Sequence, residues 1–190
     1  MKIYAKGFGL ARSLSYIYPV NNENKQVMAN KIKNVLYFHG LESEPGGEKV
    51  HYLHYEVDFV KAPPMDYTDP KVFEDWLDYV EREEPDLIIG SSMGGYFAML
   101  LATHVKTKVL AFNPDLHSRS IEIEGAKSGK EKLEGLVILG KNDDVIPPHE
   151  TLKMLNEGDN NLTVNIENEM AHRVPLPIFI DGVDHFLLTQ

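Results

Sequence analysis

Cysteine is absent from this chain of 190 residues. Its absence excludes a disulfide framework, a thiolate metal site and a cysteine nucleophile. Long apolar runs are missing as well, since none approaches the ~20 residues that a membrane-spanning helix needs. At the N-terminus, Arg12 interrupts the stretch where the apolar core of a signal peptide would lie. We therefore expect a cytoplasmic protein that does not insert into membranes.

Basic residues are scarce, because 19 Lys and Arg stand against 29 Asp and Glu, which gives a net charge of −10. A negative field of this kind argues against nucleic acid and anionic membranes as partners. The length is that of one domain, spanning residues 1–190, with a core of its own. The composition leaves self-association into a homo-oligomer open.

Short apolar runs alternate with helix-like segments along most of the chain. Strands are expected at residues 34–38, 56–60, 87–89, 107–112, 135–140 and 162–166. Helices are expected between them, at residues 49–55, from 69 to about 83, 93–105, 147–155 and 177–188, with Asp69 as an N-cap. This alternation predicts βαβ crossovers and an α/β fold with a mostly parallel sheet covered by helices on both faces.

Two regions depart from the alternation. Residues 1–33 are predicted to form a hairpin at the edge of the sheet, from β-like segments on either side of Gly7 and Gly9. Residues 115–134 are polar and contain one short helix at most. They are too few for a large cap over a site, so we expect little or no cap domain and an open pocket.

The sequence from Leu87 to Phe97 has the pattern of a nucleophile elbow. An apolar run ends in a G-x-S-x-G motif, Gly90 to Gly94, and a helix-compatible segment follows at once. In the α/β-hydrolase fold such a turn projects the central serine, here Ser92, beyond the end of the sheet. The flanking glycines are needed because strand and helix approach too closely for side chains. The N–H of Met93 would lie at the helix N-terminus, where it can stabilise an oxyanion.

A serine nucleophile needs a base, and the base needs a carboxylate that orients it. The predicted strand ending at Gly140 is followed by Asp143 and Asp144, and the last predicted strand is followed by His172. The order Ser, Asp, His is the one expected for this fold. Asp143 fits the acid best, with Asp144 as competitor. His185 is the rival base, although it lies inside the predicted last helix.

His39 also follows a strand, but it precedes the serine in the chain, so we interpret it as part of the oxyanion loop. The N–H of Leu41 is then the second oxyanion donor. The loop at 125–130 resembles a phosphate loop but is one residue short, and His51 and His54 lack a third metal ligand nearby. No metal and no organic cofactor are expected.

Four segments together resemble the small YqiA-type esterases. They are Tyr-Phe-His-Gly-Leu-Glu-Ser at 37–43, Ile-Gly-Ser-Ser-Met-Gly-Gly-Tyr at 89–96, Phe-Asn-Pro at 112–114 and Gly-Lys-Asn-Asp-Asp-Val at 140–145. The resemblance runs from about residue 34 to the end. The first 30 or so residues are additional to the family's pattern, and Glu169-Met170-Ala171 replaces a glycine-rich approach to the histidine.

The resemblance implies a compact α/β-hydrolase that cleaves esters of short acyl chains through an acyl-enzyme. It assigns Ser92, Asp143 and His172 to the triad and the N–H groups of Leu41 and Met93 to the oxyanion hole. The expected partner is a small-molecule ester. Two alternatives remain: a thioesterase that uses the same residues, and a catalytically silent hydrolase fold that acts as a binding module.

Overall fold

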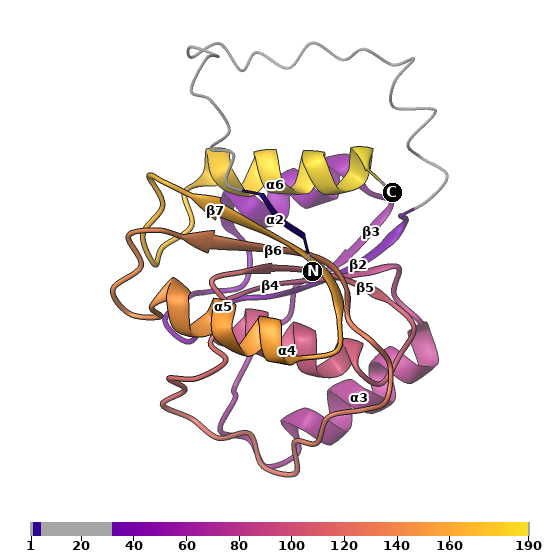
Figure 1. The fold of residues 1–190 in the computed structure, drawn as a ribbon. Helices are drawn as coiled ribbons and strands as arrows, with labels where there is room; N and C mark the ends of the chain where they lie inside the picture. Colours follow the sequence, from indigo (N-terminus) through magenta and orange to yellow (C-terminus); the bar gives the residue numbers. More distant parts are fainter. Residues whose placement is uncertain (1, 5–31, 190) are drawn as a thin grey trace.

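The computed structural model describes residues 2–4 and 32–189. Seven strands form one sheet in the order β1-β7-β6-β5-β4-β2-β3, and every neighbouring pair is parallel (Figure 1). The strands are β1 (Lys2–Tyr4), β2 (Asn34–Phe38), β3 (Phe59–Lys61), β4 (Leu87–Ser91), β5 (Lys108–Phe112), β6 (Glu134–Gly140) and β7 (Asn161–Glu167). The predicted parallel sheet is confirmed.

Helices cover both faces of the sheet, as expected. They are α2 (Gly47–Glu56), α3 (Val72–Glu83), α4 (Met93–Ala102), α5 (Pro148–Glu157) and α6 (Leu176–Leu188). Helices α2 and α6 lie on one face, and α3, α4 and α5 lie on the other (Figure 1). Each face buries its own apolar cluster, so the sheet is desolvated on both sides.

The two clusters explain why the strands read as unbroken apolar runs. Along β2, Leu36 packs on the α4 side while Val35 packs on the α6 side, and in β4 Ile88 and Ile89 divide in the same way. Successive side chains of a strand point to opposite faces, so a strand covered on both sides is apolar at every position. Helix α4 is also apolar nearly all round, because every residue except Tyr96 is buried.

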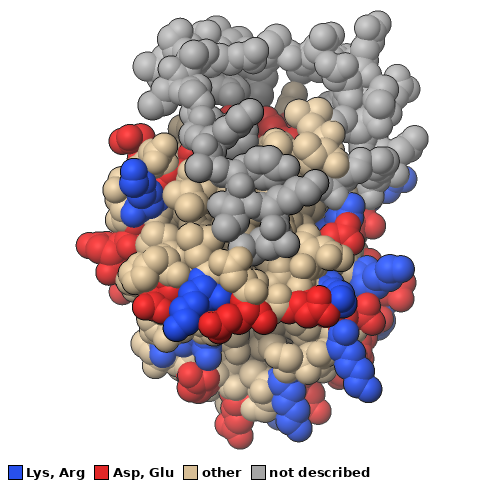
Figure 2. All heavy atoms as spheres, viewed as in Figure 1, with Lys and Arg blue, Asp and Glu red and all other residues tan. Residues whose placement is uncertain are grey.

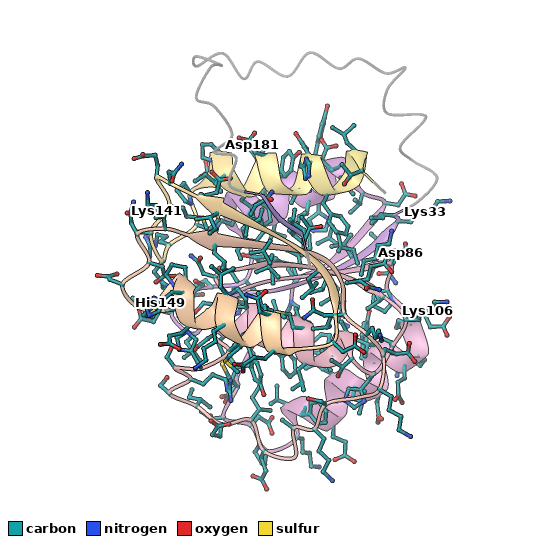
Figure 3. The ribbon with its side chains drawn as sticks, viewed as in Figure 1. Lys33, Asp86, Lys106, Lys141, His149 and Asp181 are labelled. Carbon is teal, nitrogen blue, oxygen red and sulfur yellow. The ribbon has the colours of Figure 1, made fainter. Side chains whose placement is uncertain are left out.

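The direction in which strands are added to the sheet reverses at β2. The chain runs from β2 outward to β3 and then returns to β4 on the other side of β2. In open α/β sheets, ligands bind beyond the carboxyl ends of the strands at such a reversal. Lys33 and Asp86, which precede β2 and β4, lie at one end of the sheet, and Lys141, which follows β6, lies at the other (Figure 3). The carboxyl end that carries Lys141 is therefore where a site is expected.

Some boundaries differ from the prediction. Helix α3 begins at Val72 with Lys71 at its N-cap, so the assignment of Asp69 as N-cap was wrong. Asp69 Oδ1 instead accepts the N–H of Lys71, 2.9 Å away, which closes a turn before the helix. Of the predicted N-terminal hairpin, Lys2–Tyr4 form an edge strand parallel to β7, and the second segment lies outside the described residues. Residues 113–133 contain no helix.

The surface carries charges of both signs. On the face seen in Figure 2, Lys and Arg side chains lie among Asp and Glu side chains. Mixed charge of this kind attracts polyanions weakly, and the absence of a nucleic-acid partner stays a prediction. Within residues 2–4 and 32–189, no helix combines the length and apolar character needed to cross a membrane.

Candidate active site

Ser92 occupies a strained turn between β4 and α4. Its backbone angles are φ 56° and ψ −123°, a region that side-chain-bearing residues rarely adopt, and it is the N-cap of α4. The surrounding glycines are required by contact: a Cβ on Gly90 would lie 2.1 Å from the carbonyl oxygen of Gly94. A Cβ on Gly94 would lie 2.2 Å from the carbonyl oxygen of Phe38. The strand–turn–helix geometry predicted from the motif is present.

This crowding gives a stability prediction for the elbow. Gly90→Ala is expected to lower the free energy of unfolding by about 1–3 kcal/mol, because the new methyl group must displace backbone rather than a flexible side chain. Thermal or urea denaturation would measure the change.

Gly158→Ala is the matched control, since Gly158 has φ −81° and its nearest neighbour would be the side-chain nitrogen of Asn160 at 3.2 Å. The control should be neutral or slightly stabilising. Equal effects of the two substitutions would contradict tight packing at the elbow.

The loop after β2 packs directly against the serine. A Cβ on Gly40 would lie 3.2 Å from the Cβ of Ser92 and 3.7 Å from its Oγ. Leu41, the next residue, is 40% exposed at the rim of this loop, whereas Met93, on the other side of the serine, is fully buried at the start of α4. The two expected oxyanion donors thus lie on the two segments that flank Ser92.

His39 fixes the conformation of that loop. The side chain is buried, its Nδ1 lies 2.8 Å from the carbonyl oxygen of Gly40, and its Nε2 accepts the N–H of Met65 at 3.2 Å. Because Nε2 is the acceptor, Nδ1 carries the proton and donates it to Gly40. The hydroxyl of Tyr67 donates to the carbonyl oxygen of His39 at 2.6 Å, and burial raises the pKa of Tyr67, which keeps this donor protonated. Both ring nitrogens of His39 therefore bind backbone groups.

Asp143 and His172 form a pair at the same end of the sheet. His172 Nδ1 lies 3.0 Å from Oδ2 of Asp143 and 3.2 Å from Oδ1. The Asp143 side chain is fully buried, while that of His172 is 29% exposed. Asp143 Oδ1 also accepts the N–H groups of Val145 and Ile146, at 3.0 and 2.8 Å, which fixes the direction of its carboxylate. The Nδ1 contact directs Nε2, on the other side of the imidazole, away from Asp143.

The environment of His172 favours its protonated form. The hydrogen bond with Asp143 raises the pKa of His172 above its ordinary value, burial lowers it, and the charges of Asp143, Asp115 and Asp144 raise it further. The net direction is upward. Such a histidine is a stronger base than a free imidazole.

Hydrogen bonds between the loops bring the pair together. Asn142 donates its backbone N–H to the carbonyl oxygen of Met170 at 3.0 Å, and its side chain donates to that of Asn168 at 2.8 Å. Asn113 donates its side-chain amide to the carbonyl oxygens of Ala171 and His172, at 2.9 and 3.0 Å. The Met170 side chain is buried and anchors the histidine loop in the core, in place of the glycine-rich approach of the resembling family.

The competing side chains lie elsewhere. Asp144 is exposed and affects His172 only through its charge. His185 lies in the last turn of α6, which runs away from the carboxyl end of the sheet toward the C-terminus (Figure 1). His51 and His54 are exposed on α2. Among residues 2–4 and 32–189, no group of three or more His, Cys, Asp or Glu side chains is arranged to hold a metal ion.

Sequence reasoning assigned no role to three residues that shape the site: Tyr67, Asn113 and Asp115. Tyr67 had no local signal. Asn113 follows a strand and precedes a proline, and asparagine tolerates the left-handed conformation better than most residues, which could have marked it. Asp115 is buried, and its backbone N–H donates to the carbonyl oxygen of Ser92 at 3.1 Å.

Comparison with known proteins identifies the fold. The parallel sheet and its elbow define an α/β-hydrolase fold, and residues 32–189 contain no cap domain. The sequence model of a family described as "Uncharacterised protein family (UPF0227)" matches residues 34–121. The similarity to the small YqiA-type hydrolases is thereby confirmed. The match includes Ser92 and ends before Asp143 and His172. No curated protein sequence is significantly similar to the chain.

Solved structures share the fold at low sequence identity. A monoacylglycerol lipase from Paleococcus ferrophilus is 14% identical with a TM-score of 0.63, over 82% of this chain and 94% of that one. A serine hydrolase without a lid from Xanthomonas campestris is 16% identical with a TM-score of 0.53, over 84% and 85%. The esterase domain of a Rhodothermus marinus protein is 14% identical with a TM-score of 0.57, over 83% and 84%. At these identities the likeness concerns the fold alone.

Proposed function

We propose that the protein is a serine carboxylesterase that cleaves esters of short acyl chains through an acyl-enzyme intermediate. The observation that carries the proposal is the pairing of His172 with a buried Asp143 at the same end of the sheet as the strained Ser92. A serine, a histidine and a carboxylate at this edge are the parts that acyl transfer requires. The cytoplasmic location expected from the sequence stays a prediction.

In the first half of the reaction, Ser92 Oγ attacks the ester carbonyl carbon and His172 Nε2 takes the hydroxyl proton. Asp143 holds Nδ1 and stabilises the imidazolium that forms. The negative charge on the carbonyl oxygen is stabilised by the N–H groups of Leu41 and Met93, the second of which benefits from the α4 N-terminus. The imidazolium then gives its proton to the leaving alcohol, and the acyl group remains on Ser92.

In the second half, water replaces the alcohol. His172 takes a proton from the water molecule, whose oxygen attacks the acyl carbon. Collapse of the second tetrahedral intermediate breaks the bond to Ser92 Oγ, which recovers its proton from the imidazolium, and the carboxylic acid leaves. No cofactor is needed for these steps. The absence of a helix between β5 and β6 supports an open site and small or exposed substrates.

The proposal predicts a pH dependence with a definite sign. His172 must be uncharged to accept the serine proton, so kcat/KM should rise with pH along one step and level off above it. Since the pKa of His172 is raised, the midpoint should lie above the ~6.5 of an unperturbed histidine. A pH–rate profile from about pH 5 to 9 measures the step.

Replacement of the carboxylate gives the control for that profile. Asp143→Asn removes the main cause of the raised pKa, so whatever activity remains should show its step at lower pH. A profile without a step in the wild type would argue against a histidine base.

Charge near the histidine favours an ester over an acyl-CoA thioester. Three carboxylates, Asp115, Asp143 and Asp144, act on His172, and the chain carries a net charge of −10. Coenzyme A is a polyanion, so its approach to this edge is opposed at low ionic strength. We expect kcat/KM for neutral p-nitrophenyl esters to exceed that for acyl-CoAs, and only the second to rise with added salt.

The deciding experiment is a hydrolysis screen of short and long p-nitrophenyl esters and acyl-CoAs, together with labelling by a fluorophosphonate probe. The enzyme should label stoichiometrically and prefer short neutral esters. Higher turnover on acyl-CoAs would favour the thioesterase. If the protein showed no labelling and no turnover, the catalytically silent fold that acts as a binding module would be favoured.

A further inference from the structure

Asn113 connects segments that carry the proposed triad. It follows β5 directly and is almost completely buried. Its side-chain oxygen accepts the N–H of Gly140, 2.7 Å away, at the end of the strand that leads to Asp143. Its side-chain nitrogen donates to the carbonyl oxygens of Ala171 and His172. One amide thus binds both the loop of the acid and the loop of the base.

Only an amide satisfies all three of these partners. Gly140 presents an N–H and needs an acceptor, whereas the two carbonyl oxygens need donors. A carboxylate supplies acceptors alone, and a hydroxyl supplies a single donor. The partners also fix the orientation of the amide, because the opposite orientation would place oxygen against two carbonyl oxygens.

The backbone of Asn113 is strained. Its φ is +42°, although Pro114 follows it and a residue before proline normally adopts extended angles. Such outliers persist where the surroundings fix them and are frequent at functional sites. The N–H of Asn113 donates to the carbonyl oxygen of Ile138 at 2.9 Å, which holds the outlier against β6.

The neighbours of Asn113 hold the serine. Phe112 accepts the N–H of Ser92 at 2.9 Å, and Asp115 donates its N–H to the carbonyl oxygen of Ser92 at 3.1 Å. Residues 112–115 therefore bind the backbones of the serine turn, the acid loop and the base loop at one junction. Any shift of the histidine loop against this junction changes the direction of the imidazole relative to both Ser92 and Asp143.

We infer that Asn113 is a positioning residue, whose side-chain amide sets the place of His172 relative to Asp143 and Ser92. The inference rests on the proposed hydrolase function for its catalytic consequence and on the hydrogen bonds alone for its structural one. Loss of the amide frees the backbone of residues 171 and 172. The His172–Asp143 hydrogen bond then becomes a minority state while the nucleophile stays in place.

Two variants test the inference. Asn113→Gly removes the three side-chain hydrogen bonds while glycine accepts the positive φ. Asn113→Asp keeps the size and the acceptor for Gly140 but loses both donations. Asn34→Gly is the matched control, because the Asn34 amide donates to the carbonyl oxygen of Glu83 at the opposite end of the sheet.

The first readout is kinetic. Both Asn113 variants should lower kcat on a p-nitrophenyl ester by about 10²-fold, the cost of a misplaced catalytic group, with KM changed much less. Asn34→Gly should lower the melting temperature and leave kcat of the folded enzyme unchanged. A loss of melting temperature in the Asn113 variants without a kcat effect would reduce Asn113 to a structural role and overturn the inference.

The second readout does not need activity. NMR titration of the His172 imidazole, assigned by its absence in His172→Ala, should give a midpoint above that of an ordinary histidine in the wild type. Three carboxylates act on this ring through their charge, Asp143 and Asp144 after β6 and Asp115 after β5. In Asn113→Gly, which adds no charge, the midpoint should fall toward the ordinary value. An unchanged midpoint would overturn the inference.

These readouts separate two failures. A wild type without esterase activity or probe labelling would defeat the proposed function, while the titration would still decide whether Asn113 orients His172. An active wild type whose kcat and midpoint survive Asn113→Gly would defeat the inference alone. If neither Asn113 variant folds although Asn34→Gly does, Asn113 serves the fold, and the positioning role is also overturned.

Discussion

Ser92→Ala is expected to abolish ester hydrolysis and fluorophosphonate labelling while the fold remains intact. Loss of a triad nucleophile costs on the order of 10⁴–10⁶ in turnover, because no other group can form the acyl intermediate. The fold should survive because alanine keeps the Cβ and the turn is held by backbone hydrogen bonds. Initial rates on p-nitrophenyl acetate and a circular dichroism melt measure the two parts.

Ser91→Ala is the control, since it removes a hydroxyl of the same kind from the preceding residue, at the end of β4. That variant should keep most of the turnover and should label. If Ser92→Ala retained more than about a tenth of the wild-type turnover, Ser92 would not be the nucleophile, because that much remaining activity exceeds what an oxyanion hole achieves alone.

The interior strands could be predicted because each combines a continuous apolar run with a glycine, proline or polar stop. In β4 the run from Leu87 ends at the elbow, and in β6 it ends at Gly140. A parallel sheet buried on both faces requires this pattern, so composition determines the element. The start of α3 was less predictable, because Asp69 satisfies the rules for an N-cap and for a turn equally well, and the turn formed.

The positions of candidate site residues were predictable only where chain order and strand ends specify them. Ser92, Asp143 and His172 each follow a strand, and the carboxyl ends of parallel strands meet at one edge. The selection between Asp143 and Asp144 was open in the sequence. It depends on how the loop turns, and here two N–H groups of residues 145 and 146 bind Asp143 and point its carboxylate inward.

The supporting contacts could not be predicted, because they join residues that are distant in sequence. Met65 and Tyr67 form hydrogen bonds with His39, although they are 26 and 28 positions away from it in the sequence. Asn113 binds His172 across 59 positions, and its positive φ before Pro114 contradicts the local rule for residues that precede proline. Tertiary hydrogen bonds override the local backbone preference at this junction, and the local sequence does not predict these hydrogen bonds.

Asp143→Asn is expected to lower kcat by about 10²–10⁴ with little change in KM. An amide in place of the buried carboxylate removes the negative charge beside His172, and if its NH₂ group faces Nδ1 it selects the tautomer with the proton on Nε2. That tautomer cannot accept the serine proton. Steady-state kinetics at the pH of maximal wild-type activity measure the loss.

Asp144→Asn separates the two carboxylates, because Asp144 is exposed and acts on His172 through its charge alone. It should lower kcat less than tenfold, which is the size of a screened surface charge effect.

The two histidines can be distinguished in the same way. His172→Ala should lose nearly all turnover, since the base that activates Ser92 is gone, whereas His185→Ala in the last turn of α6 should mainly lower the melting temperature. If Asp144→Asn or His185→Ala proved the more damaging member of its pair, the acid or base would be reassigned, and the nucleophile Ser92 would be unaffected by that change.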